Sequence, residues 1–252
     1  MQTRKVGRTV NRTVCERCPL RTKEVFRSFK KPELEYVSDF KKGEFSADRG
    51  ATILLEGGQS AHLYTVLSGW VFRYKILDDG RRQILNYALP GDLIGLQGSL
   101  LDMMHHSIEA LTSVNLCVFE RDNLMQLFRS HPGLGFDVTW LAAREERILD
   151  EHLISIGRRT ALERSAYLLA HLYLRAKAVD LISDKQNEIP VTQQHVADTL
   201  GLSIVHTNKT LRKLALRGLI CWKERGCDIK DIDGLLKIAS WDGVITAKRP
   251  II

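Results

Sequence analysis

The stretch that most constrains the fold lies near the end of the chain, between Thr192 and Ile220. It contains two short segments with helical spacing of apolar residues, separated by Gly201. Thr192 precedes the first segment and Ser203 precedes the second, and both residue types are favoured N-caps of α-helices. Gly201 permits a left-handed backbone conformation, which lets the chain reverse within a few residues. The stretch is therefore predicted to form a helix-turn-helix.

The second of these helices is rich in hydrogen-bond donors. We expect Leu211 and Leu214 to face the core, which leaves the following side chains for a partner: Val205, His206, Asn208, Lys209, Arg212 and Lys213. Asn can pair with adenine, Lys can donate to guanine, and Val can pack on a thymine methyl group. Val205, Asn208 and Lys209 are therefore predicted to read DNA bases, and Arg212 and Lys213 to contact phosphates. The alternative is a helical hairpin with a solvated polar face.

The residues that follow favour the DNA interpretation. The run RGLICWKERGCDIKDI predicts two short strands around residues 224–226, that is, a small wing. Two helices followed by such a hairpin form a winged helix, a much more specific pattern than two helices alone. The net charge of +7, from 37 Lys and Arg against 30 Asp and Glu in 252 residues, is compatible with a polyanionic partner.

The segment from about residue 51 to residue 120 is predicted to be an antiparallel β-roll or barrel. Its strand-like runs are short, and turn signals such as Gly69, Asp79-Gly80 and Pro90-Gly91 separate them. The run KPELEYVSDF before it predicts a short helix that begins at Pro32. The first thirty residues are basic and lack apolar periodicity, so we expect a loose arm.

A long helix is predicted after Pro132, and it carries two apolar stripes. The first stripe contains Leu134, Val138, Leu141 and Ile148, and the second contains Ala142, Leu149, Leu153 and Ile156. A helix with two such stripes has to bury both. We expect one stripe to cover the roll and the other to meet a second copy of the chain, and we assign the first stripe to this homodimer seam. The alternative is that both stripes belong to the core of one chain.

The order of these elements resembles the CRP/FNR family of bacterial transcription regulators. The matching motifs are LYTVLSGWVFRYKILDDGRRQIL, LPGDLIG, the long helix and VTQQHVADTLGLS, within about residues 30 to 235. The resemblance implies an α+β fold, in which a cyclic-nucleotide-binding-like β-roll is joined by a dimerisation helix to a winged helix-turn-helix. The expected parts are an arm (1–30), the roll (31–130), the long helix (131–157), the DNA-binding domain (158–240) and a tail (241–252).

The resemblance also implies a function. It predicts a homodimer that binds a palindromic promoter site in double-stranded DNA near RNA polymerase. By the same match, Gln194, Ser203 and His206 fall where family members contact phosphate. Family members usually carry a Glu and an Arg four residues apart on the recognition helix, where this chain has Val205 and Lys209. The DNA sequence that it recognises should therefore differ.

The effector pocket of the family is altered in this sequence. Members that bind cyclic AMP carry a Glu directly after the GDxxG turn and an Arg-Ser pair about ten residues later. Here Gly95 is followed by Leu96, and His106 stands before Ser107 in place of the Arg. Without that Arg, a cyclic phosphate lacks its bidentate partner. We therefore expect no cyclic AMP binding, and a different small ligand in this pocket remains an alternative.

Three cysteines raise the question of a cofactor. In the oxygen-sensing branch of the family, three N-terminal cysteines and one roll cysteine bind a [4Fe-4S] cluster. Cys15, Cys18 and Cys117 match three of these positions, but Glu24 stands at the fourth. Because a cluster generally takes four thiolates, we expect a regulator without a cofactor. The alternatives are an iron-sulfur or thiol-based redox sensor that uses these three cysteines, or a plain core thiol at Cys117.

Other classes of function find less support. The sequence has no phosphate-binding loop, H-E-x-x-H or G-x-S-x-G motif, so we do not expect an enzyme. A sensor module that acts on a protein partner without DNA is the other alternative, and the winged helix argues against it. No run is long and apolar enough to span a membrane, and no secretory signal begins the chain, so we expect a cytoplasmic protein without a membrane partner.

Overall fold

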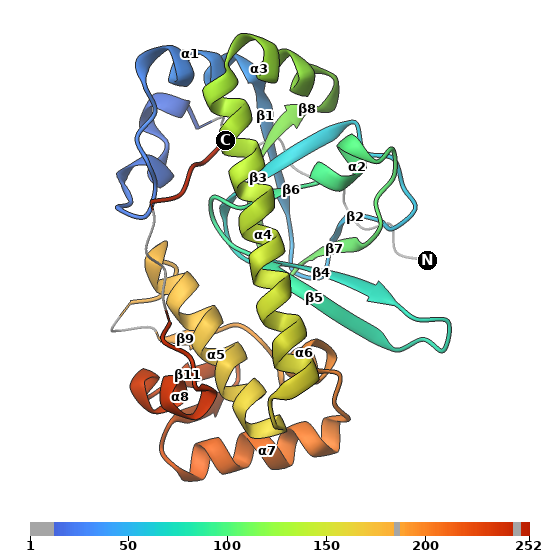
Figure 1. Cartoon of the computed structure of the whole chain (residues 1–252), viewed down its shortest axis with the longest axis vertical. Helices are drawn as coiled ribbons and strands as arrows, with labels where there is room; N and C mark the ends of the chain where they lie inside the picture. The colour runs from blue at the N-terminus through green and yellow to red at the C-terminus, as the bar shows by residue number, and fades with distance from the viewer. Residues whose placement is uncertain (1–12, 184–186, 244–247) are drawn as a thin grey trace. The chain divides into compact units, whose positions relative to one another are not determined.

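The computed structural model describes residues 13–183, 187–243 and 248–252 (Figure 1). These residues divide into two compact units. Unit 1 contains the described residues up to Arg73, together with Tyr87–Arg144 and Lys248–Ile252. Unit 2 contains Tyr74–Asn86 and the described residues from Glu145 to Gly243. The division differs from the predicted boundaries in that part of a hairpin joins unit 2 and the end of the sequence joins unit 1.

The predicted roll is present, and it consists of two four-stranded sheets. The first has the order β1 (Lys41–Ala47), β8 (Val114–Glu120), β3 (His62–Ser68) and β6 (Leu93–Ile94), and its paired strands are antiparallel. The second has the order β2 (Thr52–Leu54), β7 (Ser107–Ala110), β4 (Val71–Ile76) and β5 (Arg82–Ala88). Strand β1 was not predicted, because its sequence, KKGEFSA, has only one large apolar residue.

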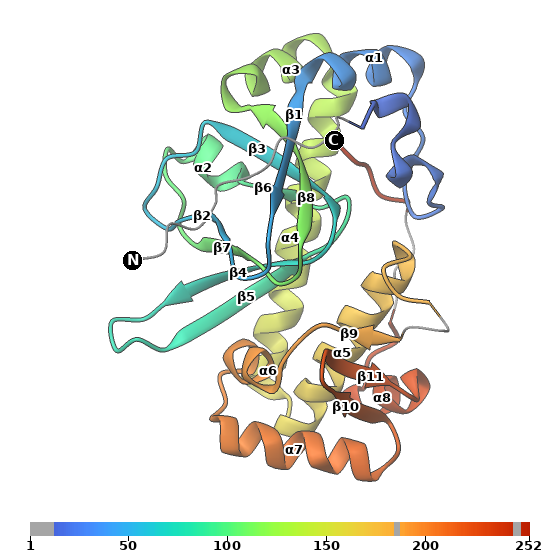
Figure 2. The same cartoon turned by 180° about the vertical axis from the view of Figure 1, so that it is seen from behind.

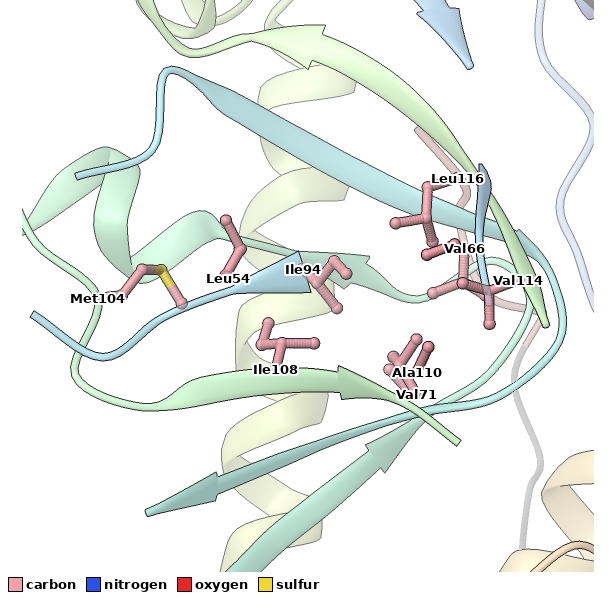
Figure 3. Close-up of a cluster of buried hydrophobic side chains, with 11 residues drawn as sticks. Leu54, Val66, Val71, Ile94, Met104, Ile108, Ala110, Val114 and Leu116 are labelled. Atoms are coloured by element: carbon pink, nitrogen blue, oxygen red, sulfur yellow. The ribbon is translucent and has the colours of Figure 1, made fainter. Parts of the chain in front are cut away.

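Alternation along the strands divides the roll into an interior and an outer face. Val66 and Leu116 are register partners on β3 and β8, and both belong to the aliphatic cluster that fills the interior (Figure 3). Thr65 and Cys117, one position away, pair on the opposite face, since successive side chains of a strand alternate. They are also buried, so a second layer of chain covers the outer face of this sheet.

The second layer includes helix α1 (Lys31–Phe40) and the chain that precedes it. Phe40 of α1 stacks on Phe119 of β8, with 5.0 Å between the ring centroids. Residues 13–30 form two short 3-10 turns, η1 (Cys15–Arg17) and η2 (Pro19–Thr22), and then an extended segment with Phe26 buried. The prediction of a loose arm is therefore wrong for residues 13–30, and residues 1–12 lie outside the described residues.

Three more helices follow in the chain, namely α2 (Leu96–Leu100), α3 (Leu124–Ser130) and α4 (Pro132–Arg158). A short 3-10 turn, η3 (Arg121–Asn123), precedes α3. The long helix α4 was predicted, and it contributes residues to both units. Among the described residues, none of the helices combines the length and apolarity that a membrane crossing requires.

The two apolar stripes of α4 have opposite environments. The first stripe is buried within the single chain, with exposures of 0% for Leu134, 2% for Val138, 7% for Leu141 and 5% for Ile148. The assignment of this stripe to a homodimer seam is therefore corrected, because these side chains are not accessible to a second copy. Leu153 of the second stripe is 72% exposed and Ile156 is 41% exposed.

Unit 2 is built around helix α5 (Ala161–Ala178), which is buried along most of its length. Thr160 caps this helix through a capping box with Glu163. The other elements are β9 (Glu188–Ile189), α6 (Gln193–Leu200), α7 (Ile204–Leu216), β10 (Ile220–Lys223), β11 (Gly226–Ile229) and α8 (Ile232–Ala239). Helix α5 contacts α6, α7 and α8. The short β9 and the helix α8 were not predicted.

Candidate nucleic-acid interface

The helix-turn-helix is formed by α6, the turn at Gly201, and α7. The Thr192 side chain accepts a hydrogen bond from the His195 N–H at 3.1 Å, and the Ser203 side chain accepts from the His206 N–H at 3.3 Å. Gly201 has a φ of 63°, in the left-handed region that glycine adopts without strain. The Leu202 N–H donates to the Ala197 carbonyl oxygen at 3.1 Å, which closes the turn. The caps and the turn are those expected from the sequence.

Helix α7 has one buried and one exposed side. Thr207, Thr210, Leu211 and Leu214 are buried. The side chains predicted to contact DNA are all exposed: Val205, His206, Asn208, Lys209, Arg212 and Lys213. Val205 is 75% exposed, so its methyl groups are accessible to a partner. The exposed side of α7 therefore combines an apolar contact, an amide and several cations.

The predicted phosphate contacts at the helix N-termini are also exposed. Ser203 lies directly before α7, where main-chain N–H groups and the helix dipole favour an anion. Gln194 lies on the first turn of α6, and its amide donates to Asp198 at 2.6 Å. Asp198 also pairs with Arg82 of β5 at 2.8 Å. The Gln83 amide donates to the Thr199 carbonyl oxygen at 3.0 Å, so the strand β5 supports α6 within unit 2.

The wing follows α7 as a small antiparallel sheet in the order β10-β11-β9 (Figure 2). A Cβ atom at Gly226 would lie 2.0 Å from the Ile189 carbonyl oxygen, so this close approach requires glycine. Burial alone would raise the pKa of the Asp228 carboxyl, but hydrogen bonds from Lys223 and Lys230 hold it below its ordinary value. The wing is thereby fixed against the connector that precedes α6.

Comparison with known proteins agrees with this geometry. Residues 44–131 match the cyclic nucleotide-binding domain model, and residues 163–238 match the Crp-like helix-turn-helix domain model. The chain is 33% identical over 218 residues to the nitrogen fixation regulation protein FixK of Bradyrhizobium diazoefficiens, covering 86% of this chain and 90% of that protein. The chain belongs to the CRP/FNR family of transcription regulators.

Other members of the CRP/FNR family are similar over most of the chain. The transcriptional activator protein FnrL of Cereibacter sphaeroides is 26% identical over 232 residues, which cover 90% of this chain and 92% of that protein. The solved structure of FixK2 from Bradyrhizobium japonicum superimposes with a TM-score of 0.68 at 25% identity, covering 77% of this chain and 96% of that one.

The effector pocket that the CRP/FNR resemblance implied lies at one end of the roll interior. Gly95 has a φ of 90°, Leu96 begins α2, and His106 and Ser107 are buried. The Ser107 hydroxyl oxygen accepts a hydrogen bond from the Glu56 N–H at 3.0 Å. Met104 packs among the interior aliphatic side chains beside Leu54 (Figure 3). At the position where the resemblance places an arginine this chain has the buried His106, so a cyclic phosphate would lack its bidentate partner.

Two of the three cysteines that match the oxygen-sensing branch, Cys15 and Cys117, interact electrostatically with a buried ion pair. The Lys41 ammonium group lies 2.6 Å from the Glu44 carboxylate and donates to the Thr13 carbonyl oxygen at 2.7 Å. Both charged side chains are only 2% exposed. Burial raises the pKa of the Cys15 thiol, and it raises the pKa of the Cys117 thiol to about 12, although Lys41 opposes both shifts. Both thiols are therefore protonated at neutral pH.

These residues do not fit a [4Fe-4S] cluster. Glu24, at the fourth ligand position, is exposed, and no three His, Cys, Asp or Glu side chains of the described residues are grouped so that they could hold a metal ion. The charge that interacts with Cys15 and Cys117 is that of Lys41, which is already paired with Glu44 and hydrogen-bonded to Thr13. We therefore assign no chemical step to a cluster.

Proposed function

We propose that this regulator binds DNA as a homodimer, reads bases with α7, and does so without cyclic AMP or a metal cofactor. The observation that carries the proposal is the exposed side of α7. There Val205 offers an apolar contact, Asn208 an amide and Lys209 an ammonium group. These groups can recognise a thymine methyl, an adenine and a guanine in the major groove.

The remaining exposed groups would position the protein on the DNA backbone. Gln194 and Ser203 lie at the N-termini of α6 and α7, and His206 is on the first turn of α7. Arg212 and Lys213 lie on its later turns, where cations can meet phosphates. Contacts of this kind fix the register of the protein on the DNA but carry no sequence information. Their loss should therefore weaken binding to all DNA sequences alike.

Homodimer formation would use the exposed stripe of α4. Leu153 and Ile156 belong to the second stripe, and Ile154 beside them is 51% exposed. Burying such side chains against a second copy gains at most about 1.5–3 kcal/mol each, and less for the half-buried isoleucines. A two-fold dimer would present two α7 helices, so the expected DNA site is a palindrome with half-site centres about 10–10.5 bp apart. Such a regulator would act at promoters, close to RNA polymerase.

Regulation without a bound effector is supported by the two altered sites. The roll interior is aliphatic around Met104, and the Lys41–Glu44 ion pair interacts with Cys15 and Cys117. The thiol-based alternative is disfavoured because reactive cysteines are thiolates, whereas burial keeps Cys15 and Cys117 protonated. Control would then act through the amount of protein.

Fluorescence anisotropy on labelled duplexes tests this proposal. Purified protein, with no ligand added, should bind a selected duplex at least about 1,000-fold more tightly than a scrambled one at physiological salt. The slope of log affinity against log salt concentration should be strongly negative, since several phosphates are neutralised. Equal affinity for selected and scrambled duplexes, or a requirement for cyclic AMP, would refute the proposal.

A further inference from the structure

The last five residues of the sequence are built into unit 1. The Arg249 N–H donates to the Val25 carbonyl oxygen at 2.8 Å, and the Arg249 carbonyl oxygen accepts from the Arg27 N–H at 2.9 Å. Figures 1 and 2 both show this segment beside the chain that leads into α1. Further on, the Thr65 hydroxyl of β3 donates to the Ile252 main-chain oxygen at 2.5 Å. Lys248–Ile252, called the tail below, thus contacts both the sheet and the layer that covers it.

The Arg249 side chain occupies a specific socket. Its guanidinium group pairs with the Asp92 carboxylate, donates to the Pro90 carbonyl oxygen at 2.6 Å, and lies 4.6 Å from the centre of the Phe26 ring. Arg249 is 4% exposed. Asp92 also pairs with Arg144 of α4 at 3.1 Å, so one buried carboxylate joins the tail to the long helix.

The turn beneath the tail is shaped to admit it. Gly91 has a φ of 84°, and a Cβ atom there would lie 2.3 Å from the Phe26 ring and 3.2 Å from the Ile251 side chain. Ile251 and Ile252 are 4% and 6% exposed. Two buried isoleucines and an arginine held by a carboxylate and a carbonyl oxygen indicate that the tail is packed specifically on unit 1.

The chain just before the tail is anchored on unit 2. The Trp241 ring lies 5.1 Å from the Tyr167 ring of α5. Gly243 has a φ of 73°, and a Cβ atom there would lie 2.9 Å from Leu174 and 3.3 Å from Leu236. Gly243 and Lys248 are five residues apart in sequence. Their Cα atoms can therefore never be more than about 18 Å apart.

From these two anchors we propose that the tail is a latch: its non-covalent hold on unit 1 adds a restraint, beside α4 and the β4–β5 hairpin, on the movement of unit 2 relative to unit 1. Any rearrangement that carries the anchors beyond the reach of the connection has to pull Arg249 out of its socket. This proposal rests on the proposed function, because the purpose of the latch is DNA binding. The latch would reduce the number of orientations that α7 can take before DNA is bound, and it would do so with no effector present.

The test lengthens the connection and leaves every tail contact intact. Fifteen Gly/Ser residues are inserted between Ala247 and Lys248, and the control carries the same fifteen residues after Ile252. The insertion makes the connection about four times longer, which lowers the equilibrium ratio of docked to undocked tail about eightfold. Hydrogen exchange at the Arg249 N–H, which needs no DNA, should show about eightfold lower protection in the insertion variant and no change in the control.

DNA affinity provides the second measurement. The insertion variant should bind the selected duplex several-fold more weakly than wild type and the control, and Arg249→Ala should weaken binding similarly. Wild-type affinity in the insertion variant would overturn the proposal, as would unchanged protection of Arg249. If wild type itself shows no specific binding, the proposed function fails and the purpose assigned to the latch fails with it. The exchange result distinguishes that failure from the absence of a latch.

Discussion

Replacing Lys41 with Met tests whether an ion pair holds the chain around Thr13 on the roll. The Lys41 and Glu44 side chains are 2.6 Å apart and 2% exposed, and Glu44 also accepts a hydrogen bond from the Thr13 N–H at 2.6 Å. The substitution leaves a buried carboxylate whose remaining hydrogen bonds come from Thr13 and carry no charge. Removal of one partner from a buried pair costs about 3–5 kcal/mol, a large part of a typical free energy of unfolding.

The neighbouring lysine offers a matched control. Lys42 pairs with Glu120 at 3.6 Å, but these side chains are 44% and 48% exposed. Exposed pairs contribute less than about 1 kcal/mol, so Lys42→Met should change stability little. Urea unfolding followed by circular dichroism measures both variants. The double variant Lys41→Met/Glu44→Gln should recover much of the loss, because no buried charge then remains. A Lys41→Met protein within about 1 kcal/mol of Lys42→Met would refute the reasoning.

The same pair predicts a pH dependence. Burial alone would raise the pKa of Glu44, but hydrogen bonds from Lys41 and Thr13 hold it below its ordinary value. The stability contributed by the ionised form is thus fully present above the ordinary glutamate pKa of about 4.3, and it is lost as the pH falls through the lower folded value. The stability difference between wild type and Glu44→Gln should therefore shrink on acidification below about pH 4.

The remaining predictions concern assembly, recognition and ligands. Leu153→Glu places a charge in the proposed seam, so sedimentation velocity should show a monomer where wild type is a dimer; an unchanged dimer would contradict the seam. Asn208→Ala and Lys209→Ala should each cost about 1–3 kcal/mol of binding free energy and relax the sequence preference. Gln194→Ala and Ser203→Ala should instead weaken binding to all DNA sequences alike. Anisotropy on a panel of duplexes measures these effects. If all four variants lost the same affinity for every duplex, the distinction between base-reading and phosphate-contacting residues would be wrong. Calorimetry should detect no cyclic AMP binding, and micromolar affinity would overturn the pocket argument. Anaerobic preparations should hold no stoichiometric iron or sulfide; a cluster that is lost in Cys117→Ala would contradict the cofactor-free proposal.

The helix-turn-helix could be predicted from the sequence because its determinants are local. Thr192, Gly201 and Ser203 act on residues within four positions of themselves, so their caps and turn are readable without knowing the rest of the fold. The wing was predictable for the same reason, since β10 and β11 are joined by a tight turn. The roll followed from its short, regularly spaced strands.

The features that the sequence did not predict depend on distant partners. Periodicity showed two stripes on α4 but not which of them meets the core of the same chain, so Leu141 was assigned to the wrong side. Strand β9 has two residues, too few for a pattern. The socket of Arg249 is formed by Asp92, 157 positions earlier, and nothing near Arg249 in the sequence indicates it. Cys117 was matched by resemblance, but the ion pair beside it became apparent only in the fold.

Selection of DNA from a random pool by the purified full-length protein, followed by sequencing, tests the central claim most directly. With no ligand added, wild type should enrich a palindrome whose half-site centres lie about 10–10.5 bp apart, and Lys209→Ala should lose preference at one position in each half-site. A homodimer that reads DNA through α7 would be contradicted if wild type enriched no motif or a motif without two-fold symmetry. It would also be contradicted if Lys209→Ala enriched the same motif with unchanged preference at every position.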